Sequence, residues 1–186
     1  MEHLHEEQPV YFPREIFYRK NIKGEEYLSF SHDWFSKFLF AMQEPSLYHE
    51  SDDIETYRLT WLRSFDNPIV IRIIKQHGTF TVILKLCNGR GGYDPGELVV
   101  NLSRTISCMD WEVFQEHLAT IDFWSMETWE DIIGFDGAEW LLEGQRDGHY
   151  HLVSRWSPKE RIVPYFQCCD YLIQLTGLVI SDREKY

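Results

Sequence analysis

Charged side chains recur at alternate positions of several strand-like segments, and these are the residues of the chain best suited to chemistry. Arginine offers forked N–H donors that match carboxylates and phosphates, and histidine beside glutamate can act as an acid–base pair. If the strands are neighbours, these side chains share one sheet surface that could bind a small anionic ligand or an acidic peptide. The candidate ligand-binding residues are Arg58, Arg72, Lys85, Glu139, Glu143, His151 and Arg155.

The same residues could instead form a ladder of cross-strand ion pairs on an exposed face, each pair worth about 0.2–1 kcal/mol. This second interpretation is favoured because surface ion pairs are common and weak. Glu139 and Glu143 lie about 13 Å apart along a strand, which is too far for the paired carboxylates of a glycoside hydrolase. His149 and His151, with Glu143 opposite, could bind a metal, but a salt-bridged histidine is favoured.

Other signatures of catalysis are weak. The sequence contains no G-x-S-x-G elbow, and its glycine-rich segment, residues 88–96, leads into an alternating strand where a phosphate-binding loop would lead into a helix. A wide hairpin loop that borders a binding site is the alternative for that segment. His3 and His5 lack a positioned third metal ligand. We therefore expect no metal and no cofactor, and leave the catalytic residues unassigned.

Two strands and a turn are predicted between residues 132 and 160. Apolar side chains alternate with charged ones on both sides of the turn, and a register that keeps charge opposite charge needs a three-residue loop, Arg146-Asp147-Gly148. That register pairs Leu142 with Leu152, Glu139 with Arg155 and Glu143 with His151. It places Arg155 and His151 on the same face as Arg58 and Arg72. Ser157, Pro158 and Glu160 then predict a capped helix that ends at Gly177.

The pattern Gly134-x-Asp136-Gly137-x-x-Trp140-x-x-Glu143, followed by Tyr150-x-x-Val153-x-Arg155-Trp156-x-Pro158, resembles a group of uncharacterised bacterial proteins. The similarity runs from about Tyr57 to Leu178 and implies a shared fold unit. It implies no activity.

The remaining elements support a sheet with helices. A two-residue His77-Gly78 turn would pair Ile73 with Val82, and Ser107 or Asp110 can cap a helix that begins near residue 108. An earlier helix with an apolar stripe begins near Ser31 and ends at Pro45, and a small hairpin turns near Asn21. These patterns predict an α+β fold: a mostly antiparallel sheet of five to seven strands with two or three helices packed on one face.

Length and composition define the function classes. The 186 residues fit an N-terminal arm and helix over residues 1–53 and a main α+β sheet domain over residues 54–186, which together form one compact domain. A net charge of -12 argues against nucleic acid and anionic membrane as partners. There is no charged leader before an apolar run, and Cys87, Cys108, Cys168 and Cys169 form no C-x-x-C pair, so a cytoplasmic protein with reduced thiols is expected.

Two functions from different classes follow. The acidic composition and the 16% aromatic content favour a small binding or interaction protein of the immunity or adaptor type, with a protein partner. The alternative is an enzyme that acts on a small anionic substrate at the charged sheet face. Self-association through Trp124 and Trp129 is a third hypothesis.

Overall fold

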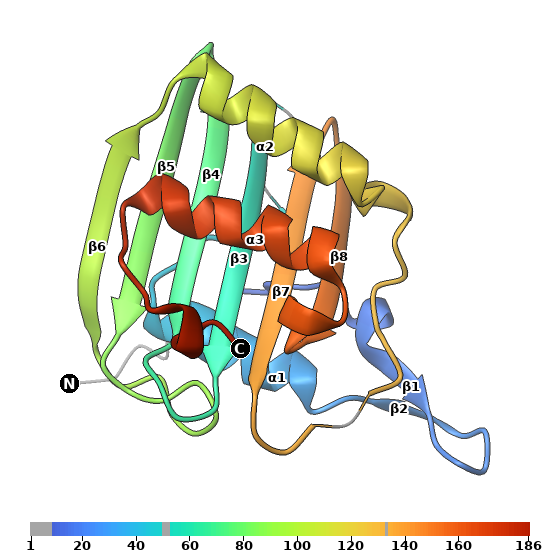
Figure 1. Cartoon of the computed structure of the whole chain (residues 1–186). Helices are drawn as coiled ribbons and strands as arrows, with labels where there is room; N and C mark the ends of the chain where they lie inside the picture. Colours follow the sequence, from blue (N-terminus) through green and yellow to red (C-terminus); the bar gives the residue numbers. More distant parts are fainter. Residues whose placement is uncertain (1–8, 50–52, 133) are drawn as a thin grey trace, which may run out of the picture.

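A six-stranded sheet, antiparallel throughout, forms the centre of the computed structural model, which describes residues 9–49, 53–132 and 134–186 (Figure 1). Its strands are β3 (Ile54–Arg63), β4 (Ile69–Gln76), β5 (Thr79–Cys87), β6 (Leu98–Thr105), β7 (Ala138–Arg146) and β8 (His149–Trp156), in the spatial order β6-β5-β4-β3-β7-β8. The predicted α+β fold with an antiparallel sheet of five to seven strands is confirmed.

The order of the strands follows from the connections between them. Strands β3 to β6 form a meander, in which each strand pairs with the next along the chain. Helix α2 (Cys108–Thr120) follows, and β7 then returns to the free edge of β3 before β8 completes the sheet. A small separate hairpin of β1 (Tyr18–Lys20) and β2 (Glu26–Leu28) lies near the N-terminus, as predicted around Asn21.

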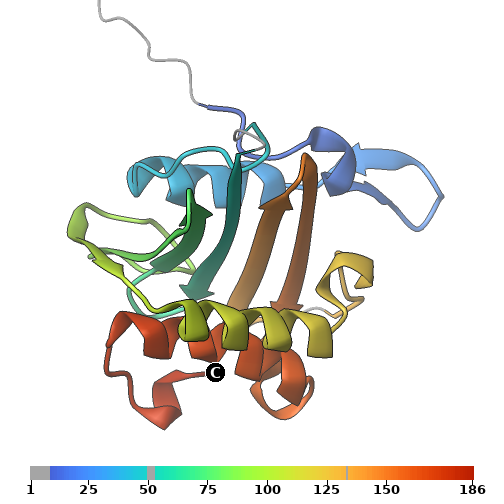
Figure 2. The ribbon, with the colours of Figure 1, turned by 90° about the horizontal axis from the view of Figure 1, so that it is seen from above.

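Helices lie on both faces of the sheet. Figure 2 shows α2 and α3 (Val163–Thr176) across one face of the sheet. Helix α1 (Ser31–Ala41) lies on the opposite face with the rest of residues 9–49, which we call the N-terminal segment. Short 3-10 helices complete the fold: η1 (Arg14–Phe17), η2 (Phe123–Ser125), η3 (Pro158–Glu160) and η4 (Asp182–Glu184). The charged face was expected to be open to solvent or covered by a partner. That expectation is wrong, because α1 and its flanking segments cover it.

Each face therefore has its own apolar core. Tyr57, Trp61 and Trp140 belong to the core beneath α2 and α3. The core beneath α1 combines side chains of the N-terminal arm and helix with side chains of the sheet: Tyr11, Phe12, Phe17, Phe35, Phe38, Leu39, Met42, Leu62, Val70, Cys87, Leu141 and Leu152. This shared core crosses the predicted domain boundary at residue 53. Residues 50–52 at that boundary, like His3 and His5, lie outside the described residues.

The helix ends follow local capping chemistry. The Ser107 hydroxyl accepts a hydrogen bond from the Asp110 N–H, and the Asp110 carboxylate accepts one from the Ser107 N–H, so α2 begins with the predicted cap. The last helix begins later than predicted. Ser157 has left-handed backbone angles and its hydroxyl accepts from the Ala138 N–H, so residues 158–160 form only η3. Gly177, at φ 75°, ends α3 as expected.

The two hairpins of the sheet whose registers were predicted from the sequence give opposite results. The β4–β5 hairpin has the predicted register, with Ile73 opposite Val82 across the His77-Gly78 turn. The predicted register of the β7–β8 hairpin is wrong. Its turn contains only Asp147 and Gly148, both with positive φ, and it places Trp140 opposite Arg155. The parity of β8 is therefore reversed relative to the prediction.

The reversed parity of β8 is possible because both faces of the sheet are covered and both bury apolar and charged side chains. Arg155 faces the α3 side, where it is buried and donates hydrogen bonds to the carbonyl oxygens of Glu127, Thr128 and Ser154. Leu152 faces the opposite side and is buried beneath the N-terminal segment. A hydrophobic side chain can therefore be buried on either face. An arginine can be buried wherever carbonyl oxygens accept its hydrogen bonds.

The turn can be tested at Asp147, whose φ is 52°. Replacement by valine should lower the free energy of unfolding by about 1–2 kcal/mol, because a β-branched residue is strained in left-handed backbone. Asparagine tolerates this conformation and should change stability little. Urea denaturation of Asp147→Val and Asp147→Asn measures both effects. In the alternative loop Arg146-Asp147-Gly148, residue 147 would have right-handed backbone angles, which valine tolerates. Equal stability of the two variants would therefore support the three-residue loop.

Candidate functional site

The predicted site residues divide between the two faces of the sheet. Arg58, Arg72, Lys85, Glu139 and Glu143 project toward α1, as their alternation with the core residues Tyr57, Ile71, Leu84, Trp140 and Leu142 requires. His151 and Arg155 lie on the opposite face because of the reversed β8 parity. The hypothesis of one charged surface that contains all seven residues is therefore wrong.

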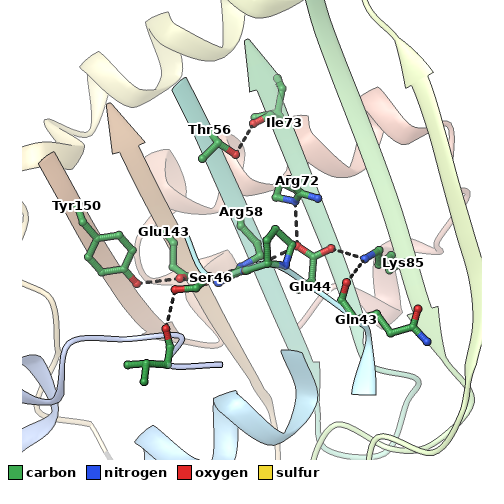
Figure 3. A network of polar contacts seen from close by, with 12 residues as sticks. Gln43, Glu44, Ser46, Thr56, Arg58, Arg72, Ile73, Lys85, Glu143 and Tyr150 are labelled. Carbon is green, nitrogen blue, oxygen red and sulfur yellow. Dashed lines mark hydrogen bonds and ion pairs between the residues drawn. The ribbon is translucent and has the colours of Figure 1, made fainter. Parts of the chain in front are cut away.

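Arg58 forms the centre of a buried ion network on the α1 face (Figure 3). Its guanidinium donates two parallel hydrogen bonds to the Glu143 carboxylate, from Nε to Oε2 and from Nη2 to Oε1, both 2.8 Å. The Tyr150 hydroxyl donates to the same Glu143 Oε1 at 2.8 Å. Burial alone would lower the pKa of Arg58, but the ionised Glu143 beside it holds that pKa above its ordinary value. A bidentate contact of this kind is the strongest pairing geometry between a guanidinium and a carboxylate.

Glu44 brings a second carboxylate into the network from the segment after α1 (Figure 3). Its Oε2 lies 3.0 Å from Arg72 Nε and 3.5 Å from Arg58 Nη1, and its Oε1 lies 2.9 Å from Lys85 Nζ. The side chain of Glu44 is fully buried. Three neighbouring strands of the sheet thus each direct a cation at one carboxylate of the N-terminal segment.

Backbone carbonyl groups complete this contact. Gln43 adopts φ 51°, which turns the chain sharply after α1, and its carbonyl oxygen accepts a hydrogen bond from Lys85 Nζ at 2.7 Å. The Pro45 carbonyl oxygen accepts from Arg58 Nη1 at 2.7 Å. The acidic peptide predicted to bind these cations is therefore a segment of the same chain. The cations are buried and engaged, so this surface offers no open site for an anionic ligand.

Sequence reasoning missed Glu44 and Tyr150. Glu44 follows an apolar helix and precedes a proline, where a glutamate is ordinarily solvated, so no local pattern marks it. The predicted register, which pairs Glu143 with His151, would turn the neighbouring Tyr150 to the face opposite Glu143. The corrected register, which pairs Gln145 with Tyr150, is the signal that would have placed its hydroxyl near Glu143.

Glu139 lies on the same face but apart from the network, two pleats and about 13 Å along β7 from Glu143. Its carboxylate accepts a hydrogen bond from the Ser154 hydroxyl. Desolvation raises the pKa of Glu139, and the negative charge of Glu130 adds to the effect, while Ser154, Arg19 and Arg155 oppose it. Within the described residues Glu139 forms no ion pair, unlike Glu44 and Glu143.

Two adjoining cavities meet at Glu139, and we call them together the aromatic groove. The first, of about 420 Å³, lies between α1, the glycine-rich loop and the segment before β7. The second, of about 630 Å³, extends toward β1, β2 and residues 129–132 and 134. Both are lined by Phe30, Ser31, Glu139 and Trp156. The glycine-rich loop, predicted to border a site, lines the first cavity through Gly91, Gly92 and Tyr93.

Exposed aromatic rings surround the first cavity. Phe135 is 91% exposed and Phe30 is 76% exposed, and Phe65 and Tyr93 are also exposed. Trp34, Phe35 and Trp156 contribute further aromatic rings to the wall. The only charged residues among the described residues that line this cavity are the acids Asp136 and Glu139.

Two glycines shape the wall of the groove. A Cβ atom at Gly134 would lie 1.8 Å from the indole nitrogen of Trp156, and one at Gly137 would lie 2.7 Å from the same ring. Bare backbone at both positions thus lets the indole pack against the chain. This contact gives a physical reason for the spacing Gly134-x-x-Gly137 and for Trp156, all of which belong to the sequence pattern quoted above.

The histidine hypotheses are not supported by the geometry. His151 Nε2 lies 3.0 Å from the Met126 carbonyl oxygen, and burial lowers the pKa of this histidine. Glu143, expected opposite His151, pairs with Leu152 across the strands and binds Tyr150 with its carboxylate. The described residues contain no group of three or more His, Cys, Asp or Glu that could hold a metal ion.

Comparison with known proteins adds no family. No protein-family model matches the chain, and no curated protein matches it either. The resemblance to uncharacterised bacterial proteins therefore stays a prediction. Among the described residues, no helix is both long and apolar enough to cross a membrane.

The ion network predicts a large effect of removing one partner. Glu143→Ala should lower the free energy of unfolding by about 3–5 kcal/mol, because Arg58 would remain buried without its bidentate partner. Tyr150→Phe removes one neutral donor and should cost about 1 kcal/mol. Asp182→Ala, which breaks the exposed pair with Lys159, is the control and should change stability little. Denaturant titration would contradict the network if Glu143→Ala and Asp182→Ala were equally stable.

Glu139 predicts a pH dependence of stability. Its folded pKa lies above the ordinary value of 4.5, so the folded state binds the proton more tightly than the unfolded state. This contribution is complete below pH 4.5 and is lost as the pH rises through the folded pKa. Glu139→Gln cannot titrate, so its stability relative to the wild type should increase over that window. Denaturation midpoints from pH 4 to pH 7 measure the difference, and a pH-independent difference would contradict the prediction.

Proposed function

We propose that this protein is a small binding protein that engages a basic protein partner through the aromatic groove. The observation that carries the proposal is the set of exposed aromatic side chains around the first cavity, whose charged lining among the described residues is acidic. An immunity- or adaptor-type role in the cytoplasm belongs to the same proposal. The resemblance to uncharacterised bacterial proteins is compatible with it but adds no activity.

Aromatic residues at this position are suited to recognition. Phe135 and Phe30 are far more exposed than large apolar side chains usually are, so they add little to the stability of the isolated chain. Large aromatic side chains are frequent anchors at protein interfaces, where they fill pockets and exclude water. Glu139 at the junction of the two cavities supplies a charged group for such an anchor to meet.

The charge of the chain favours a basic partner. The 30 acidic residues exceed the 18 basic residues, and complementary charge accelerates encounter and excludes acidic competitors. A nucleic acid or an anionic membrane would meet repulsion at this net charge. The proposed partner is therefore a protein with a basic surface.

The geometry disfavours the other two hypotheses. For an enzyme at the charged face, Arg58 and Arg72 lie beneath the N-terminal segment, and Arg155 faces the other side of the sheet. For self-association, Trp129 is only partly exposed: its indole N–H donates to the Ile16 carbonyl oxygen and its ring packs against Phe17. Trp124 is likewise only partly exposed and packs against Phe123.

Site-specific photocrosslinking in the native cell tests the proposal. A photoreactive phenylalanine at position 135 should trap one stoichiometric protein with a basic surface. The same residue at position 179, an exposed apolar position after α3, should not trap it. Adducts with many proteins at both positions, or none at position 135, would contradict the proposal.

The trapped protein then allows a quantitative test. Phe65→Ala with Phe135→Ala should weaken its binding to the purified chain at least ten-fold in calorimetry, because two exposed anchors are removed. The matched control is Met109→Ala with Val179→Ala, which truncates two exposed apolar residues outside the groove and should leave the affinity unchanged. Equal affinities of the two double variants would overturn the assignment of the groove.

A further inference from the structure

Glu139 differs from the buried Glu44 and Glu143 on its face of the sheet, because it is only partly buried and lines both cavities of the aromatic groove. Glu44 and Glu143 are each held by cations of the same chain at 2.8–3.5 Å. Glu139 has the Ser154 hydroxyl as a hydrogen-bond donor but no cation within ion-pair distance among the described residues. A desolvated carboxylate without a counter-ion is unfavourable.

The surroundings of Glu139 do not supply the missing charge. Arg19 and Arg155 influence it only from a distance: Arg19 stacks on Trp129, 4.4 Å from the ring centre, and Arg155 is bound by carbonyl oxygens on the other face. Glu130, a second acid, raises the pKa of Glu139 further and is itself paired with Arg161. Glu139 also lines the first cavity, and no Lys or Arg of the described residues lines that cavity, whereas Arg19 and Lys20 line the second.

The first cavity fits a cationic side chain. Its volume of about 420 Å³ falls within the range of small-ligand sites. Seven aromatic residues of the described part of the chain line it, and aromatic faces attract cations that lie against them. The protein already uses this contact elsewhere, since Arg63 lies 4.5 Å from the ring centre of Trp61 and Arg146 lies 5.1 Å from that of Trp124.

We propose that the first cavity of the aromatic groove binds a single arginine side chain of the protein partner, with its guanidinium on Glu139 and its plane against the aromatic wall. Arginine is favoured over lysine because its flat, weakly hydrated guanidinium stacks on rings and donates in a fork. One Glu139 oxygen accepts from Ser154, and the other oxygen and the exposed Asp136 are available acceptors. This inference rests on the proposed function and adds the chemical group that is recognised.

The probe is an acetylated and amidated pentapeptide, Gly-Gly-Arg-Gly-Gly, titrated into the full chain and followed by the indole N–H signals of Trp34 and Trp156 in NMR spectra. Citrulline in place of arginine keeps the shape and removes the charge, and lysine keeps the charge and removes the fork. The arginine peptide should shift the signals saturably. The citrulline peptide should bind at least ten-fold more weakly, and the lysine peptide more weakly than the arginine peptide.

Matched variants identify the carboxylate. Glu139→Gln should weaken binding of the arginine peptide at least ten-fold, while Glu116→Gln, which neutralises an exposed acid on α2, should leave it unchanged. Since Glu139→Gln removes a partly desolvated charge, it should fold at least as stably as the wild type. No saturable shift, equal binding of the citrulline peptide, tighter binding of the lysine peptide, or an unchanged Glu139→Gln would each overturn the inference.

The trapped partner separates this inference from the proposed function. If the partner binds Glu139→Gln with wild-type affinity but loses affinity for the Phe65 and Phe135 double variant, the groove is the interface and the arginine site is wrong. If the arginine peptide binds through Glu139 but position 135 traps no protein, the cation site stands and the proposed protein partner is wrong.

Discussion

The contact of Glu44 with the cations of the sheet is the constraint on which the packing of the N-terminal segment against the sheet depends. Arg58, Arg72 and Lys85 belong to three consecutive strands, and an apolar cover over them would leave charges buried without counter-ions. The N-terminal segment can cover them because it carries a carboxylate at the point of contact, while Glu143 neutralises Arg58 from within the sheet. The apolar core beneath α1 and the ion network therefore require one another.

The groove depends on the same contact. Phe30, Trp34 and Phe35 come from α1 and the residue before it, and they face the sheet, the glycine-rich loop and the segment before β7 across the first cavity. The cavity thus exists only where the N-terminal segment is docked on the sheet. The predicted charged face is therefore the contact by which the chain forms the aromatic groove at its border.

Local sequence patterns are sufficient to predict turns and helix ends, because these depend on residues only a few positions apart. The β4–β5 hairpin, the Ser107 cap and the Gly177 end of α3 follow from turn and capping chemistry within a few positions. The β7–β8 register could not be obtained in this way. The predicted register assumes that one face of the sheet is apolar and the other exposed to solvent. This assumption fails because both faces are covered. Arg155 and Leu152 were misplaced for this reason.

The candidate site was less accessible to sequence reasoning than the fold. Glu139 was selected as one member of a charged face, yet its distinguishing property is the absence of an ion pair among the described residues, which depends on where Ser154 and Arg19 lie in space. Phe30 and Phe135 lie more than 100 residues apart and meet only through the topology of the sheet. No periodic pattern could have brought them to one cavity.

The packing of Trp156 on Gly134 and Gly137 separates the parts of the groove that can vary from those that cannot. The rim residues Phe30, Phe65, Tyr93 and Phe135 project into solvent, so exchanging them alters the outer surface at little cost in stability. The wall behind them consists of an indole resting on bare backbone, which accepts no added methyl group. Substitutions at the rim can therefore change the shape and polarity of the outer groove while the inner wall and the fold are retained.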